Sequence, residues 1–146
     1  MNHQNYRVYT VMGDGELAEG SVWEGAMSAA HYKLDNLCAV VDRNRLQISG
    51  NTEDVMHHDD LHERFRSFGW HVIDVKNGNS IEELDAAFEE AKTVKGKPTV
   101  LIANTVKGCG SSVMENKASW HHHVPGDEEY EQIMKDLEER KEAALK

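Results

Sequence analysis

Two oxygen-bearing side chains, Asp14 and Asn44, each follow an apolar stretch and could bind the same cation. Asp14 lies between two glycines directly after residues 7–12, and Asn44 comes shortly after the apolar residues 37–41. A carboxylate and an amide oxygen are ligands that suit a hard cation such as Mg²⁺. The glycines allow the backbone to approach a phosphate group near the start of the following segment. These residue types predict a site for a metal-bound phosphate.

The alternative interpretation of the Gly-Asp-Gly motif is a hairpin turn, because Asp-Gly often joins antiparallel strands. Asn44 follows Asp14 by 30 positions, however, and residues 16–34 have the pattern of an amphipathic helix. A tight turn cannot contain that helix, whereas a strand–helix–strand unit normally makes two parallel strands. The carboxyl ends of those strands meet at one edge of the sheet, where open α/β sheets bind their ligands. We therefore expect Asp14 and Asn44 to lie together at this edge.

The rest of the chain continues the alternation of strands and helices, which predicts an α/β fold with a parallel sheet and crossover helices. Residues 1–146 are expected to form one domain. Further strands are expected at residues 70–75 and 99–106. Helices are expected at residues 61–68, 81–95 and from 127 onward, the last with an apolar contact stripe. A loop is expected at residues 49–60, and a helix-capping box at Ser80 and Glu83.

Composition excludes several classes of function. The chain has 16 Lys and Arg against 26 Asp and Glu, a net charge of −10, and no basic patch that would favour nucleic acid. No apolar run approaches the roughly 20 residues that span a bilayer, and no signal peptide is evident. Cys38 and Cys109 have different surroundings in the sequence, which does not indicate a disulfide framework. A cytoplasmic location is expected.

Residues 13–50, GDGELAEGSVWEGAMSAAHYKLDNLCAVVDRNRLQISG, resemble the transketolase family, in particular the thiamine-diphosphate-binding N-terminal subunit of its split form. The similarity continues through RFRSFGWHVIDV, KPTVLIANTVKGCGSS and MENKASWHHHVPGDEEY. It implies the thiamine-diphosphate-binding fold, with this chain as the second half of that domain and its first part lacking. The implied activity is transfer of a two-carbon ketol unit from a ketose phosphate to an aldose phosphate. We expect this activity only when the missing segments complement the chain.

The resemblance also implies which residues bind the cofactors, thiamine diphosphate and Mg²⁺ or Ca²⁺. The Asp14 carboxylate, the Asn44 side-chain oxygen and the backbone carbonyl of Leu46 would bind the metal. Gly15 would meet the diphosphate through its backbone N–H. Arg45 stands where the family commonly has glycine.

Two further residues are implied to be catalytic. His121 would reach the cofactor and the donor's hydroxyl group, which needs a residue that exchanges protons near neutral pH. Glu19 would join a carboxylate network that links two cofactor sites across a dimer; alternatively it is a solvated carboxylate near a helix N-terminus. His122 replaces a usual glycine, and Cys109 stands where a lysine is frequent.

The implied partners are sugar phosphates and a pyrimidine-binding transketolase subunit or domain, in a homo- or hetero-oligomer of the pentose phosphate pathway. One alternative is another thiamine-diphosphate enzyme, such as a pyruvate dehydrogenase component or deoxyxylulose-phosphate synthase. Another is a non-catalytic fragment that binds the cofactor or serves in assembly. His57, His58 and His62 could form a transition-metal cluster, but histidines on a polar loop are more often solvated.

Overall fold

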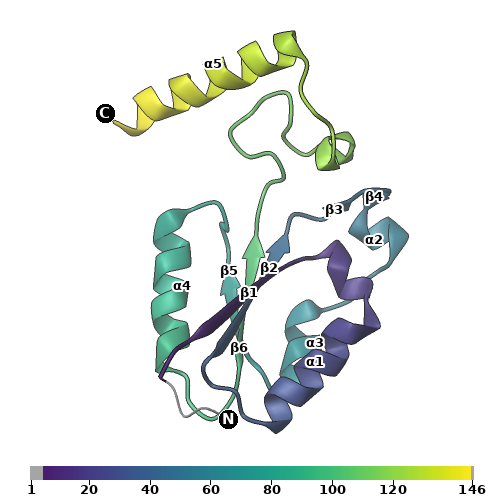
Figure 1. The fold of residues 1–146 in the computed structure, drawn as a ribbon, viewed down its shortest axis with the longest axis vertical. Helices are drawn as coiled ribbons and strands as arrows, with labels where there is room; N and C mark the ends of the chain where they lie inside the picture. The colour runs from purple at the N-terminus through teal and green to yellow at the C-terminus, as the bar shows by residue number, and fades with distance from the viewer. Residues whose placement is uncertain (1–4, 146) are drawn as a thin grey trace.

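The computed structural model describes residues 5–145 and contains a four-stranded parallel sheet with helices on both faces (Figure 1). The strand order is β1-β2-β6-β5, and every neighbouring pair is parallel. The strands are β1 (Val8–Gly13), β2 (Leu37–Arg43), β5 (His71–Val75) and β6 (Thr99–Asn104). The predicted α/β class and parallel sheet are confirmed.

Both faces of the sheet are covered because its central strands are apolar on both sides, as in most parallel sheets. Ala39 and Val41 of β2 pack towards α1 (Gly20–His31) and α3 (Leu61–Ser67). Cys38 and Val40 point to the opposite face, where α4 (Ile81–Thr93) packs. The alternation along β2 therefore gives the domain two separate cores.

An aromatic group holds α1 and α3 against the sheet. The Phe65 ring lies 5.1 Å from Trp23 and 5.6 Å from Trp70, measured between centroids. The Trp70 indole donates a hydrogen bond of 3.0 Å to the carbonyl of Ala26 in α1. This packing fixes α1, and with it the turn that carries Asp14.

The predicted helix over residues 16–34 is wrong at its start. A short 3₁₀ turn, η1 (Gly15–Ala18), comes first, and α1 begins only at Gly20 because Glu19 is extended at φ −75° and ψ 127°. Leu17 is buried in the α1-side core, and its carbonyl accepts a 2.8 Å hydrogen bond from the Trp23 indole. The burial of Leu17 thus accounts for the interruption between η1 and α1, which the amphipathic pattern of residues 16–34 does not predict.

The segment expected as a loop, residues 49–60, is partly regular. Strands β3 (Leu46–Gln47) and β4 (Gly50–Asn51) form a small antiparallel hairpin. The helix α2 (Thr52–Val55) follows, and the Asn51 side chain caps it by accepting from the Glu53 amide at 3.0 Å. The hairpin lies at the carboxyl edge of the sheet, and its residues Leu46 and Gln47 line the same pocket as Asp14.

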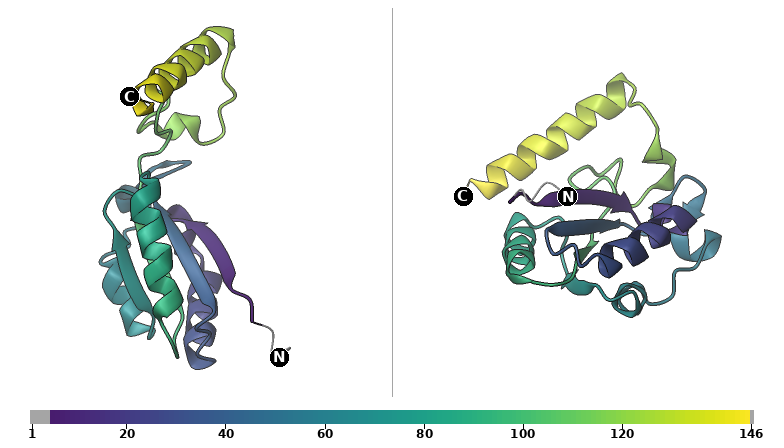
Figure 2. Two further views of the ribbon diagram at one scale, coloured as in Figure 1. Left: turned by 90° about the vertical axis from the view of Figure 1, so that its left-hand side faces the viewer. Right: turned by 60° about the horizontal axis from the view of Figure 1, so that its bottom comes forward.

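The C-terminal part lies beyond the carboxyl edge of the sheet (Figures 1 and 2). It contains η2 (Ala118–His121) and the long helix α5 (Asp127–Ala144). The loop before η2 contacts α5 through Ser112, which donates to Asp136 at 2.6 and 2.7 Å, and through Cys109, whose sulfur accepts from Arg140 at 3.3 Å. The expected contact stripe of α5 is largely exposed at Tyr130, Met134 and Leu137. Within residues 5–145, no helix combines the length and the low polarity that crossing a membrane requires.

The predicted capping box at the start of α4 is only half formed. Ser80 Oγ accepts a 3.3 Å hydrogen bond from the Glu83 amide, as predicted. The Glu83 carboxylate accepts from the Asn77 amide at 2.9 Å, three positions before the expected partner. Glu83 therefore links the helix to the preceding turn instead of closing the box.

Replacing Ser80 with alanine is expected to lower the free energy of unfolding by about 1 kcal/mol, because the Glu83 amide loses its acceptor. Urea denaturation followed by circular dichroism measures this change. Ser80→Asp keeps an acceptor and should stay close to the wild type; an equal loss in both variants would contradict the capping role.

Candidate functional site

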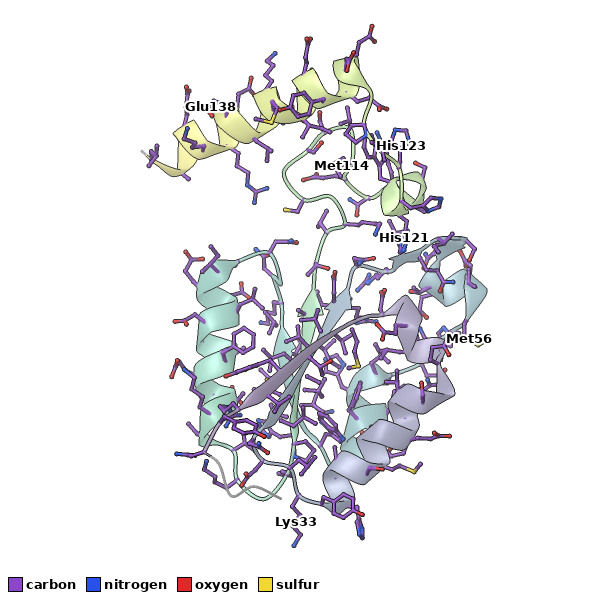
Figure 3. The ribbon with its side chains drawn as sticks, viewed as in Figure 1. Lys33, Met56, Met114, His121, His123 and Glu138 are labelled. Atoms are coloured by element: carbon purple, nitrogen blue, oxygen red, sulfur yellow. The ribbon has the colours of Figure 1, made fainter. Side chains whose placement is uncertain are left out.

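A pocket of about 480 Å³ lies at the carboxyl ends of β1 and β2. Its lining includes Asp14, Gly15, Asn44, Leu46 and His121, from three separate parts of the chain. His121 reaches this edge from η2 (Figure 3). The structure therefore brings together every candidate metal and cofactor residue of the sequence.

Asp14 is almost completely buried at the base of this pocket, with 2% of its surface exposed. Its Oδ1 accepts from the Gly15 amide at 2.9 Å, and its Oδ2 accepts from the Arg45 amide at 2.6 Å. Arg45 has φ +65°, a left-handed conformation that favours glycine. This conformation explains why glycine suits the position, and it is the one in which the Arg45 amide meets the carboxylate.

Burial raises the pKa of the Asp14 carboxyl above its usual value of 3.8. The hydrogen bonds from the Arg45 and Gly15 amides oppose this shift, and the nearby Asp42 carboxylate adds to it. Burial and a neighbouring carboxylate both disfavour the ionised form of a carboxyl group. A divalent cation bound to Asp14 would offset both the loss of water and the repulsion.

Asn44 forms a tight local turn, in which its Oδ1 accepts from the Leu46 amide at 3.0 Å. Leu46 in turn pairs with Asn51 in the small hairpin. The turn holds the Asn44 side chain and the Leu46 backbone together beside the pocket. An amide oxygen has two lone pairs, so this hydrogen bond leaves Asn44 with one free for a cation.

Gly15 packs closely against the hairpin. A Cβ atom at this position would lie 2.9 Å from Gln47 Cβ, which is too close for two carbon atoms. Glycine at this position therefore lets the turn at the start of η1 lie directly against the hairpin beside the pocket. Any side chain at position 15 would push the turn and the hairpin apart.

Replacing Gly15 with alanine is expected to move the hairpin and to weaken binding of a diphosphate cofactor by about tenfold or more, which is about 1.4 kcal/mol. Isothermal titration calorimetry with thiamine diphosphate and Mg²⁺ measures this. Gly20→Ala is the matched control, because a Cβ at Gly20 has no neighbour within 4 Å. Unchanged affinity in the Gly15 variant would show that the close packing is not needed.

Charge in the pocket is mixed. Carboxylates of Asp14, Glu16 and Asp42 line it, together with the ammonium group of Lys107. Gln47 is a pocket residue that sequence reasoning missed. Lys107 begins a glycine-rich loop after β6, and its place beyond the carboxyl end of a strand predicts that it lies at this edge, where it lines the pocket.

Other candidate residues lie elsewhere. Glu19 is exposed, between η1 and α1, and is not part of the pocket lining. His122 has a negative φ of −145°, outside the left-handed region that favours glycine, so the absence of glycine there causes no strain of that kind. His123 contacts Glu129 at 3.0 Å on the surface.

The histidines of residues 57–62 do not converge on one point. His57 contacts Asp59 at 3.0 Å, and His62 contacts Asp74 of β5 at 2.9 Å. His58 is buried with 2% exposed. In the described part of the chain, no group of three or more His, Cys, Asp or Glu side chains is arranged to hold a metal ion. A cation in the pocket would therefore need amide, backbone and cofactor oxygens in addition to Asp14.

Comparison with known proteins identifies the family. The family model described as "Transketolase, thiamine diphosphate binding domain" matches residues 1–143. The chain belongs to the transketolase family. Its relatives include an apulose-4-phosphate transketolase subunit of Phocaeicola vulgatus, 46% identical over 140 residues, with 96% of this chain and 50% of that protein covered. Human transketolase is 46% identical over 134 residues, with 91% of this chain and 21% of that protein covered.

Solved transketolases share the fold. The crystal structure of transketolase from Campylobacter jejuni matches 91% of this chain and 21% of its own chain, with a TM-score of 0.85 and 29% sequence identity. The chain spans about half the length of the P. vulgatus subunit, and about a fifth of the longer transketolases. The pocket at the strand ends thus belongs to a thiamine-diphosphate-binding domain of the transketolase family.

Proposed function

We propose that this chain binds thiamine diphosphate together with Mg²⁺ in the pocket around Asp14 and contributes that site to a transketolase. The observation that carries the proposal is the convergence of Asp14, Gly15, Asn44 and Leu46 at the ends of two parallel strands. The family assigns the cofactor to this domain. The carboxylates in the pocket support the metal, because they would repel an anionic diphosphate that arrived without a cation.

The residues of the pocket fit both groups. The Asp14 carboxylate, the Asn44 Oδ1 and the Leu46 carbonyl would hold Mg²⁺, which prefers oxygen ligands and keeps several from water and phosphate. Ca²⁺ has the same ligand chemistry and could replace it. The Gly15 N–H, which donates to Asp14 Oδ1 in this structure, would turn to the diphosphate in the bound state. Lys107 would provide a positive charge in the same pocket.

The reaction we propose is transfer of a two-carbon ketol unit from a ketose phosphate to an aldose phosphate. Thiamine diphosphate supplies the carbanion chemistry when it is bound. In this chain, a ring nitrogen of His121 would accept or donate the proton of the donor's hydroxyl group, since His121 is exposed at the pocket. Glu19 would act only in an assembly, because its side chain is exposed and lies outside the pocket lining.

The proposal includes a partner. Relatives that are named as transketolase subunits, including the 6-deoxy-6-sulfo-D-fructose transketolase subunit of a Clostridium species, indicate enzymes that are divided between chains. We infer that this chain works with a pyrimidine-binding subunit or domain, in the cytoplasm and in an oligomer of two or more chains. The substrate names of those relatives differ, so we propose only the class of substrate, a sugar phosphate. A role in the pentose phosphate pathway is consistent with that class.

The test is calorimetric titration of thiamine diphosphate into the purified chain with MgCl₂, and again with EDTA in place of the metal. We expect a binding heat with Mg²⁺ and none with EDTA. Binding also raises the melting temperature, because a ligand at about 100 times its Kd stabilises the folded state by about 2.7 kcal/mol. A folded chain that binds nothing, or that binds equally well without metal, would overturn the proposed site.

A further inference from the structure

A second cavity lies beside the cofactor pocket, at the carboxyl ends of β2 and β6. It has a volume of about 270 Å³. Asn44 and Leu46 line both cavities, so the turn that they form is the wall between the two. The other residues around the second cavity include Arg43, Arg45, Asn51, Asn104 and Asn116. We call it the Arg43–Arg45 pocket.

The two neighbouring cavities differ in charge. The cofactor pocket has three carboxylates and one ammonium group among its lining residues. The described lining of the Arg43–Arg45 pocket has two arginines and no carboxylate. Asp42, which precedes Arg43 in the chain, lines the cofactor pocket, and its Oδ1 accepts a hydrogen bond from the hydroxyl of Thr105. In a chain with a net charge of −10, this local positive charge favours an anion.

The guanidinium groups of the two arginines have no acidic partner in the described part of the chain. Its ion pairs include Arg64 and Arg66, but neither Arg43 nor Arg45. Arg43 Nη1 contacts the neutral Asn104 Oδ1 at 3.5 Å, which is long for a hydrogen bond. Because a guanidinium group has five N–H donors, most of the donors of both arginines stay available for a ligand.

Asn104 fixes the place of Arg43 at the cavity wall. Asn104 Nδ2 donates to Asp74 Oδ1 at 3.1 Å and to the carbonyl of Val75 at 3.0 Å. Because both hydrogens of this amide group are used by β5, its oxygen is the atom that faces Arg43. The arginine thus has a supported position beside the cavity.

The backbone of the cavity wall is unusual at two positions. Arg45 has φ +65° and Asn116 has φ +56°, and they are two of the four described residues other than glycine that have a positive φ. Residues in such unfavourable conformations gather at ligand-binding sites. In this conformation Arg45 donates its amide to Asp14, while its exposed side chain lies beside the Arg43–Arg45 pocket.

We propose that the Arg43–Arg45 pocket binds the phosphate group of a small phosphate monoester between its two guanidinium groups. Guanidinium groups bind phosphate oxygens through paired, charge-assisted hydrogen bonds. Asn51 adds a donor, because its Oδ1 accepts from the Glu53 amide at 3.0 Å and its NH₂ group remains for the ligand. The cavity of about 270 Å³ is smaller than the roughly 300–1,000 Å³ of sites for drug-sized ligands, which favours a phosphate on a short carbon chain over a nucleotide.

This inference goes beyond the proposed function, because it requires neither thiamine diphosphate nor a metal ion. A sugar phosphate and inorganic phosphate present the same anionic group, so both serve as probes. Without a metal ion, the carboxylates of the cofactor pocket disfavour an anion there. Binding in the absence of metal therefore reports on the Arg43–Arg45 pocket.

Inorganic phosphate and ribose 5-phosphate are titrated separately into the full chain, in a buffer of low ionic strength without divalent metal. The side-chain Nε–H signals of the arginines are followed by NMR. We expect both probes to shift the signals of Arg43 and Arg45, and ribose to shift neither. Arg66, which pairs with Glu63 on α3, is the internal reference. Tighter binding of ribose 5-phosphate would assign the pocket to a sugar phosphate, and equal affinities would assign it to free phosphate.

Two variants test the guanidinium groups. Arg45→Gly removes one of them and keeps the backbone, because glycine adopts φ +65° readily. Arg43→Gln removes the other. Each should weaken binding of both probes by about tenfold or more, because charge-assisted hydrogen bonds are lost. Arg66→Gln, an arginine outside the pocket lining, is the matched control and should bind like the wild type.

Circular dichroism identifies a variant that fails to fold, and Arg45→Gly keeps the test valid if Arg43→Gln does so. Three results would overturn the inference: neither probe moves the Arg43 and Arg45 signals, both arginine variants bind the probes as well as wild type, or ribose binds as well as the phosphate probes. A loss of binding in Lys107→Gln but not in the arginine variants would place the anion in the cofactor pocket and would also overturn it. The titration with thiamine diphosphate and Mg²⁺ is a separate measurement, so failure of either proposal is seen independently of the other.

Discussion

Replacing Asp14 with alanine is expected to remove Mg²⁺-dependent binding of thiamine diphosphate, with a loss of affinity of at least about 100-fold. Loss of groups that merely support a metal ligand costs about 10- to 100-fold, and Asp14 would be a ligand itself. Its two carboxylate oxygens are held by the amides of Gly15 and Arg45 at 2.9 and 2.6 Å, which fix it in the pocket. Isothermal titration calorimetry measures the loss, and the rise in melting temperature with Mg²⁺ and cofactor should disappear with it.

Matched variants separate this effect from general damage. Asp54→Ala removes an exposed carboxylate that is outside the pocket lining, and it should bind like the wild type. Asp14→Asn keeps the size of the side chain but not its charge, and it should also lose Mg²⁺-dependent binding. If Asp14→Asn bound the metal and cofactor normally, the carboxylate would not be the ligand.

The pH dependence has a definite sign. Burial raises the pKa of Asp14 above 3.8, so a proton competes with the metal at a higher pH than it would for an ordinary carboxyl. Affinity of the wild type for Mg²⁺ and cofactor should fall as the pH is lowered towards this raised pKa. In the chain without metal, the contribution of Asp14 to stability is full below pH 3.8 and is lost as the pH rises through the raised pKa. Bound Mg²⁺ would reverse this dependence, because it stabilises the ionised carboxylate.

Replacing Phe65 with alanine is expected to lower the free energy of unfolding by about 3–5 kcal/mol, which is a large part of the stability of a domain this size. Phe65 is 1% exposed and packs between Trp23 and Trp70, so its removal leaves a cavity in the α1-side core. Leu17, in the turn after Asp14, belongs to the same core. Urea denaturation measures the stability, and cofactor titration should show weaker binding because this turn loses support.

Tyr32→Ala is the control for the loss of an aromatic ring, because Tyr32 is 62% exposed at the end of α1. Its stability should lie within about 0.5 kcal/mol of the wild type. Phe65→Leu keeps most of the buried volume and should lose less than the alanine variant. Equal losses in Phe65→Ala and Tyr32→Ala would mean that the aromatic group does not hold α1 in place.

The sequence by itself determined the parallel α/β fold and the meeting of Asp14 with Asn44. Both follow from short-range rules: apolar residues of β2 and β6 on consecutive positions require cover on both faces, and a strand–helix–strand unit puts both strand ends at one edge. Recognition of the transketolase family also came from local motifs, since GDGELAEGSVWE and DRNRLQISG are continuous in the chain.

Only the tertiary structure decided how the site is built. The break between η1 and α1 depends on the burial of Leu17, and the left-handed Arg45 depends on its hydrogen bond to Asp14, 31 positions away. Lys107 enters the pocket because β6 lies beside β2 in the sheet, although a long stretch of chain separates the two strands. The open edge of β1 is a property of strand order. Each of these features depends on contacts between distant residues, which no local pattern specifies.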